Sequence, residues 1–369
     1  MIIFIFFLFL SGKSFTLKDC IEIAEKNNEE LLFAKTELDL AKEKYREALS
    51  MRYPQLLFDA YYAKHKLIFP SILSFPYGGF LLPQDRDISY GAKITFSQLL
   101  YSGGRVKLIK TQAELYYKER KAYYLKKLNE LYFDVKKIFY RSVYHKKRIE
   151  LLKEIYEEKK DDYILLEIED AEADYKNSIA ELKRVMGVEF SEDINVEGEL
   201  VERTERIDKE KIIAKAFEYR PDLKGYTEWE KLSELSARLV YLERRPNLKI
   251  FSTFDYLADP YSREERWKKN WEVAVVLSFP LFDGFAGWSR WRQKKLILKQ
   301  SRIKKAALEN DLRFEIEKTI NEYERNVNKI EFLKKREKKD ELKFLELLYE
   351  NNILWEKLIY LTGEETLNR

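Results

Sequence analysis

Residues 88–97 read ISYGAKITFS and alternate between two kinds of side chain. The apolar set consists of Ile88, Tyr90, Ala92, Ile94 and Phe96. The small or polar set consists of Ser89, Gly91, Lys93, Thr95 and Ser97. Successive side chains of a strand point to opposite faces, so this stretch predicts a strand with one apolar and one polar face. Such a strand suits a membrane barrel with lipid outside and a wet lumen inside, and it equally suits a soluble sheet with one solvated face.

Three other stretches also have strand character. Residues 271–279 alternate less strictly, and the stretches that begin at Pro54 and Pro246 are rich in aromatic residues. By strand alternation, the polar residues that would face a lumen and tune its ion preference are Asp59, Lys93, Thr95, Asp255 and Glu272. The aromatic residues that would form girdles at the membrane interfaces are Tyr61, Tyr62, Tyr90, Phe254, Trp267 and Trp271. The alternatives are simple solvation for each polar residue and ordinary core burial for each aromatic one.

An internal repeat connects these strands. Three short motifs occur twice: NEEL (28–31) and RPDL (220–223), YPQL (53–56) and RPNL (245–248), SQLLYSG (97–103) and SFPLFDG (278–284). The difference in residue number between matching positions of the two copies is otherwise constant. It changes only in the segment that connects the paired strands, at 67–86 in the first copy and 259–269 in the second. A length difference belongs in a loop, so the alignment is self-consistent. Each copy therefore reads helix, strand, loop, strand, long helix and returning helix.

Long helices are predicted by three stretches that contain neither Gly nor Pro, at 13–53, 105–186 and 288–362. Within the second stretch, apolar and small residues follow alternating steps of three and four: Leu128, Leu131, Val135, Ile138, Ser142, His145, Ile149, Leu152 and Tyr156. A heptad seam of this length is typical of helices that pack as a coiled coil.

The composition leaves little material for catalysis or metal binding. The chain has one cysteine, Cys20, and two histidines, so an internal disulfide and a multi-Cys metal site are excluded. No phosphate loop or nucleophile motif is present, so we expect no enzyme activity and no cofactor. Lys plus Arg (68) nearly balances Asp plus Glu (64) without a basic block, so we expect no nucleic-acid partner. Cys20 lies in no lipobox, and we expect it to be a buried thiol.

The N-terminus predicts an exported protein. Residues 2–10 are all apolar, a run too short to cross a bilayer as a helix but typical of the h-region of a signal peptide. Small residues at Gly12 and Ser14 offer a cleavage site. We therefore expect a signal peptide at 1–14 and a mature start near Phe15.

Four strands per chain cannot close a membrane barrel, and open sheet edges are not tolerated in lipid. The chain must therefore oligomerise to close a barrel, or it is not a membrane barrel. The architecture resembles that of the TolC-like outer-membrane factor family, in which three protomers each lend four strands to one barrel. The resemblance covers almost the whole mature chain and rests on the order and duplication of the motifs. Besides the helix turns at 28–31 and 220–223, its junction residues are Pro54, Gly103, Gly104, Pro246, Pro280, Asp283 and Gly284.

The resemblance implies a mainly α protein with membrane β-structure. Four strands per protomer would complete a trimeric 12-stranded outer-membrane β-barrel on a long coiled-coil α-barrel in the periplasm. The expected repeats and their parts are 15–198, with a β-hairpin at 54–99 and a helical hairpin at 103–187, and 199–369, with a β-hairpin at 246–282 and a helical hairpin at 284–369.

The resemblance also implies a function. A homotrimer in outer-membrane lipid would be a passive conduit for the efflux or export of small molecules or protein. A periplasmic adaptor protein and an inner-membrane transporter would energise it.

The helical hairpins depart from the family pattern, because both are short and neither has the family's Gly-containing turn at its tip. Acidic residues crowd the end of the first hairpin: Asp161, Asp162, Glu167, Glu169 and Asp170. Three-fold symmetry would turn any inward-facing acid into a cation-selective constriction, whereas a charge run is more often a solvated helix face. Two alternatives to the channel stay open: a periplasmic coiled-coil scaffold or tether without a pore, and a truncated homologue that lacks transport.

Overall fold

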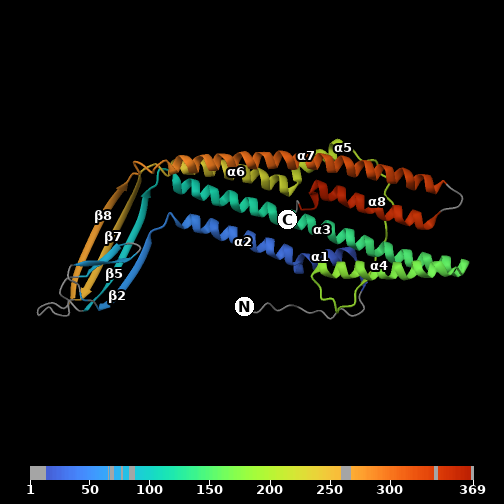
Figure 1. Ribbon diagram of the computed structural model, residues 1–369, viewed down its shortest axis with the longest axis horizontal. Coiled ribbons are helices and arrows are strands. Elements are labelled where there is room, and N and C mark those ends of the chain that lie inside the picture. The colour runs from blue at the N-terminus through green and yellow to red at the C-terminus, as the bar shows by residue number, and fades with distance from the viewer. Residues whose placement is uncertain are drawn as a thin grey trace. The chain divides into compact units, whose positions relative to one another are not determined.

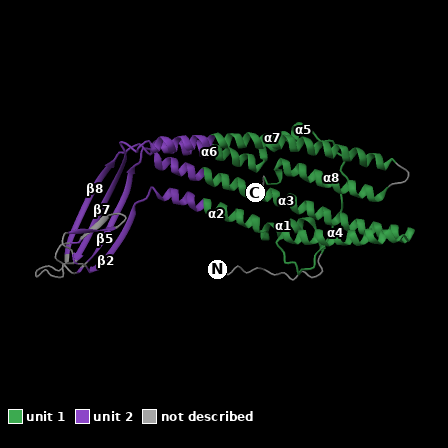
Figure 2. Cartoon of the chain, in the orientation of Figure 1, with its two compact units in different colours: residues 1–41, 115–231, 299–369 green, residues 42–114, 232–298 purple. Residues whose placement is uncertain are grey.

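The computed structural model of the chain describes residues 14–64, 66, 70–75, 78–82, 88–258, 267–335 and 340–366. The expected signal peptide lies outside these residues, apart from Ser14. The chain forms two compact units, which Figure 2 colours separately. Their residues are 1–41, 115–231 and 299–369 for unit 1, and 42–114 and 232–298 for unit 2.

The described residues are mainly helical (Figure 1). The helices are α1 (Leu17–Asn27), α2 (Glu29–Ser50), α3 (Arg105–Lys159), α4 (Asp162–Met186), α5 (Lys209–Tyr219), α6 (Pro221–Leu242), α7 (Ala286–Lys334) and α8 (Glu341–Thr362), followed by a short 3-10 helix, η1 (Glu364–Thr366). The strands are β1 (Ser14–Phe15), β2 (Gln55–Lys64), β3 (Ser71–Phe75), β4 (Gly78–Leu82), β5 (Ile88–Tyr101), β6 (Asn195–Val196), β7 (Asn247–Ala258) and β8 (Trp267–Ser278). One succession of elements occurs twice, as α1–α2–β2–β5–α3–α4 and as α5–α6–β7–β8–α7–α8. Among the described helices, none combines the length and the apolar character needed to cross a membrane.

The opening helix of each copy is broken in two, at places that the repeat aligns. Between α1 and α2, the Asn28 side chain accepts a hydrogen bond from Leu31 N at 3.0 Å and donates one to Val185 O at 2.9 Å. In the second copy Pro221 begins α6 directly, where its missing N–H breaks no helical hydrogen bond. An asparagine cap therefore makes, in the first copy, the break that a proline makes in the second.

The core of unit 1 consists mainly of two apolar clusters, one for each copy. The first joins α1 to α4 with the short strands β1 and β6, and the second joins α5 to α8. The heptad seam predicted for α3 is its buried face: Leu128, Leu131, Val135, Ile138, Ser142 and Leu152 are buried, and Ile149 and Tyr156 pack around Leu152. The prediction of a buried thiol is also confirmed, because Cys20 is fully buried in α1 and burial raises its pKa to about 12.

Unit 2 contains a four-stranded antiparallel sheet in the order β2-β5-β7-β8. Its boundaries correct the expected ones. The strand β8 ends at Ser278 instead of 282, because Pro280 cannot donate a backbone hydrogen bond to a ladder. The helices α3 and α7 begin at Arg105 and Ala286 instead of 103 and 284, because the residues before them have positive φ.

The loop expected at 67–86 contains an element that the sequence did not predict. Strands β3 and β4 pair in antiparallel register, from Ser71 opposite Leu82 to Phe75 opposite Gly78. The corresponding loop of the second copy lies outside the described residues from 259 to 266.

Candidate functional site

The register of the sheet aligns like residues in rows across all four strands. One row joins Phe58, Ile94, Phe254 and Trp271. The next row joins Asp59, Lys93, Asp255 and Asn270. Because neighbouring rows point to opposite sides of a pleated sheet, the sheet has one apolar and one polar face.

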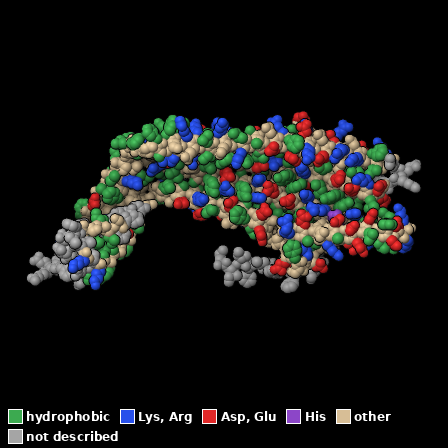
Figure 3. Space-filling model, viewed as in Figure 1, with side chains coloured by type: hydrophobic (Ala, Val, Ile, Leu, Met, Phe, Trp, Pro, Cys, Tyr) green, Lys and Arg blue, Asp and Glu red, His purple; other side chains and the backbone are tan. Residues whose placement is uncertain are grey.

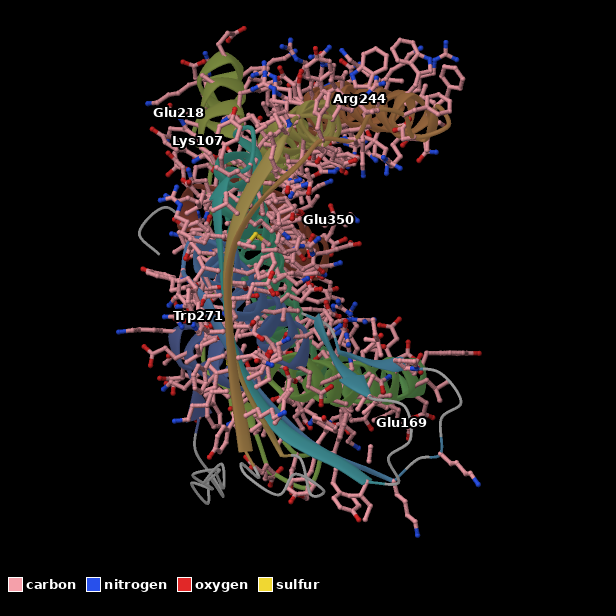
Figure 4. All side chains as sticks on the ribbon, turned by 90° about the vertical axis from the view of Figure 1, so that its left-hand side faces the viewer. Lys107, Glu169, Glu218, Arg244, Trp271 and Glu350 are labelled. Carbon is pink, nitrogen blue, oxygen red and sulfur yellow. The ribbon has the colours of Figure 1, made fainter. Side chains whose placement is uncertain are left out.

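The apolar face is strongly exposed. Trp271, which Figure 4 labels on β8, is 77% exposed, and Phe58 is 65% exposed. The other exposed large apolar residues of this face are Leu56, Tyr62, Ile94, Phe96, Phe254, Val273, Val275 and Leu277. A contiguous apolar surface of this kind marks contact with lipid or with another protein, since its exposure to water is energetically unfavourable.

The polar face carries all five residues that strand alternation assigned to a lumen. Lys93 Nζ lies 3.6 Å from Asp255 Oδ1, and their side chains are only 10% and 21% exposed. Asp59 lies opposite Lys93 on the other neighbouring strand. Thr95 and Glu272 lie in the adjacent row of the same face, on either side of Thr253. The sheet therefore gathers these polar groups on one surface, opposite the apolar one.

The aromatic residues divide between the two faces. Tyr62, Tyr90, Phe254 and Trp271 lie on the apolar face, where the rings of Tyr62 and Tyr90 stack with centroids 6.4 Å apart. Tyr61 is an exception, because it pairs with Gly91 and lies on the polar face. The expectation that Tyr61 and Tyr62 belong to one girdle was therefore wrong. Trp267 is the first residue of β8.

The junction residues lie where the chain changes from one kind of element to another. Pro54 and Pro246 directly precede β2 and β7, and Pro280 follows β8. Ser102 Oγ accepts a hydrogen bond from Val106 N at 3.2 Å, and Asp283 Oδ2 accepts one from Gly287 N at 2.8 Å. Both hydrogen bonds satisfy N–H groups at the starts of α3 and α7.

Left-handed backbone follows each of these caps. The φ angles of Gly103 and Gly104 are +61° and +88°, and those of Gly284 and Phe285 are +63° and +65°. Glycine has no Cβ and adopts this conformation without strain, whereas Phe285 does so at a cost. In the first copy the turn is also crowded, since a Cβ added at Gly103 would lie 2.4 Å from Arg245 Cβ.

These two turns give a matched pair of substitutions. We expect Gly103→Ala to lower the thermal midpoint of the protein more than Gly284→Ala does. Both variants carry the cost of left-handed backbone, about 1–2 kcal/mol. Only Gly103→Ala also clashes with Arg245, because nothing lies within 4 Å of a Cβ at Gly284. Circular dichroism of both variants in one detergent makes the comparison, and equal midpoints would contradict the crowded junction.

The acidic residues at the end of the first helical hairpin are exposed. Asp161 caps α4 by accepting a hydrogen bond from Tyr163 N at 3.0 Å, which gives it a structural role. Asp162, Glu169 and Asp170 lie in the first turns of α4 with exposed side chains, and Figure 4 labels Glu169. Lys160, with φ of +51°, takes the place of a turn glycine between α3 and α4.

One group of residues near the junctions was not predicted. A cleft of about 700 Å³ opens between the start of α3, the end of α6 and the start of α7, all within unit 2. Its basic and aromatic lining residues are Lys107, Arg238, Tyr241, Arg245, Trp291 and Lys295. On the side shown in Figure 3, apolar and basic side chains gather over the ends of α6 and α7 in unit 2. At the offset of the repeat, Trp288 and Trp291 stand where the first copy has Lys107 and Lys110, but this difference does not reveal that three helix ends meet.

Neither a protein-family model nor a curated protein matches the chain in a sequence comparison. Solved structures do match. The chain resembles CusC, whose structures concern folding and transmembrane channel formation, with a TM-score of 0.65, 13% identity and coverage of 98% of this chain and 91% of CusC. It resembles the MtrE outer-membrane channel of Neisseria gonorrhoeae with a TM-score of 0.65, 15% identity and coverage of 95% and 87%.

The CmeC outer-membrane channel of Campylobacter jejuni matches with a TM-score of 0.59, 14% identity and coverage of 95% of this chain and 84% of CmeC. At these identities the likeness establishes the fold. The agreement extends over nearly the whole of both chains, so it includes the sheet as well as the helical hairpins. The chain therefore has the fold of the TolC-like outer-membrane channels.

Proposed function

We propose that the chain is one subunit of an outer-membrane channel. The observation that carries this proposal is the sheet, which exposes a contiguous apolar face and gathers polar side chains on the other. Lipid on the first side and water on the second satisfy both faces. The fold shared with CusC, MtrE and CmeC supports the same reading.

Closure of the barrel requires more than one copy. Within the described sheet, β2 and β8 are the edge strands, and their outer backbone groups need partners in lipid. Pairing of β8 with β2 of the next copy is a head-to-tail contact that closes into a ring. Three copies would give a 12-stranded barrel whose polar faces line the lumen, with Asp59, Lys93 and Asp255 repeated around it.

In this proposal transport is passive. The polar face would line a water-filled lumen with charged side chains. The channel would conduct small molecules or protein from the periplasm outward. Energy would come from an inner-membrane transporter, reached through a periplasmic adaptor protein. The exposed acids Asp161, Asp162, Glu169 and Asp170 would act as an entrance ring only if the trimer turns them inward.

A scaffold or tether without a pore is the second candidate. The observation in its favour is the short second arm of each helical hairpin, since α4 has 25 residues and α8 has 22, against 55 in α3 and 49 in α7. A scaffold in water, however, has no use for an exposed face that contains Phe58, Trp271 and Leu277.

Single-channel recording distinguishes the two candidates. We expect the purified mature protein to be a trimer in detergent and to give discrete conductance steps in a planar bilayer. The oligomer mass is measured in the same detergent, so that an absence of conductance can be attributed to a protein of known oligomeric state. A monomer without conductance would exclude the channel and favour the scaffold.

A further inference from the structure

We propose that the cleft between α3, α6 and α7 binds the phosphate headgroup of an anionic phospholipid. The inference rests on the proposed function, because it needs the sheet to lie in a bilayer. It assigns a lipid site that is separate from the polar face and from the conduit.

The position of the cleft suits a headgroup. Gly103 and Gly104 line it, two and three residues after the last residue of β5. The apolar face of the sheet reaches the same end of the strands, where Tyr101 and Leu277 are exposed. If lipid tails cover that face, the cleft lies at the level where tails give way to headgroups, beside the helical end of the sheet.

The charge of the cleft is strongly positive. Its basic lining residues are Lys107, Arg238, Arg245 and Lys295, and its acidic one is Glu234. Glu234 is already paired with Arg238 at 2.7 Å, and Arg245 Nη1 donates to Gly103 O at 3.2 Å. Lys107 and Lys295, both exposed, form no ion pair with any residue that the structure describes. Two ammonium groups from different helices therefore face a cleft without a protein anion to balance them.

One of these two charges also lies at an unfavourable place on its helix. Lys107 is in the first turn of α3, where a positive charge opposes the helix dipole and where no acidic residue offsets it. The start of α7 is different, because Asp283 caps it and Arg290 lies 3.2 Å from Glu243. An external anion would offset the charge of Lys107 at the start of α3, and the phosphate of a lipid supplies one.

The aromatic rings in and beside the cleft also suit the interface between membrane and water. Trp288 and Trp291 stack with centroids 4.9 Å apart, and Lys295 Nζ lies 5.5 Å from the centre of the Trp291 ring. Tyr241 lines the cleft from α6 and is largely exposed. Trp and Tyr prefer the headgroup level of a membrane, where one end of the ring is apolar and the other is wet.

Lipid retention by the assembled protein tests the site. The protein is incorporated into vesicles of phosphatidylcholine with one quarter phosphatidylglycerol, floated on a density gradient, released into mild detergent and weighed by native mass spectrometry. We expect retained phosphatidylglycerol, at up to one molecule per chain, with an affinity roughly ten-fold or more above that for phosphatidylcholine, since each lysine near an anionic surface strengthens binding several-fold. Lys107→Gln with Lys295→Gln should remove this preference.

The matched control is Lys110→Gln with Lys294→Gln, which removes the same charge from the same two helices outside the cleft. It should keep the preference. Protein that does not float with vesicles would overturn the membrane function and the lipid site together. Protein that floats without a preference for phosphatidylglycerol, or whose preference survives the loss of Lys107 and Lys295, would overturn the lipid site alone.

Discussion

Val273→Arg is expected to make insertion into phosphatidylcholine vesicles less favourable by about 2–4 kcal/mol per chain, the cost of arginine on a lipid-facing barrel strand near the bilayer midplane. Val273 is 56% exposed on the apolar face and lies near the middle of β8. A guanidinium there would lose its water without gaining a partner. Urea titration of the vesicle-bound protein measures the change, with proteolysis as a second readout of insertion.

The neighbouring residue supplies the control. Glu272 is also exposed, but it lies on the polar face opposite Thr253. Glu272→Arg should insert as well as the unmodified protein, because its side chain would face water. It should instead shift the reversal potential of the channel toward anions, since one carboxylate per chain becomes a cation. Equal insertion defects in the two variants would mean that the faces do not separate lipid from water.

The sequence predicted the faces of the sheet well, because strand alternation is a local property. The assignment of Asp59, Lys93 and Asp255 to one face needed only the phase of three separate strands, and the register brings them into one row. The long helices were predicted equally well, since the stretches 105–186 and 288–362, which form most of them, contain neither Gly nor Pro. The seam from Leu128 to Leu152 followed from spacing alone.

Features that depend on distant contacts were not predicted. The resemblance implied a helix turn at 28–31, but not the hydrogen bond by which Asn28 contacts the carbonyl of Val185, far away in the sequence. Tyr61 was assigned by residue type instead of by phase, so it was placed with Tyr62 although adjacent strand residues face opposite ways. The cleft near Trp291 requires three helix ends to meet, and no single stretch contains that information.

A buried charge cluster in unit 1 was also invisible in the sequence. Lys136 on α3 contacts Glu356 on α8 at 2.9 Å and also Glu365, which follows α8. Arg203, from the segment that connects the two copies, approaches Glu356 at 3.4 Å. Burial disfavours the Lys136 ammonium, but the two carboxylates outweigh burial and raise its pKa. The cluster thus joins the first copy, the connecting segment and the C-terminal helix.

Lys136→Met is expected to be strongly destabilising because it leaves the Glu356 side chain, only 5% exposed, without its nearest cation. Removal of one partner from a buried ion pair costs about 3–5 kcal/mol, and Arg203 should keep the loss near the lower end. For a cooperative unit of this size, that corresponds to a thermal midpoint lower by roughly 6–12 °C. Circular dichroism of the assembled protein in detergent measures it.

A double substitution distinguishes the cost of an unpaired buried charge from the cost of lost packing. Lys136→Met with Glu356→Gln removes the charge as well as its partner, so it should recover most of the stability that Lys136→Met loses. Lys153→Met is the matched control, since Lys153 forms an exposed pair with Glu172 at 3.0 Å and such pairs contribute about 0–1 kcal/mol. A Lys136→Met variant as stable as Lys153→Met would show that the cluster does not hold the two copies together, and a double variant as unstable as the single one would assign the loss to packing instead of charge.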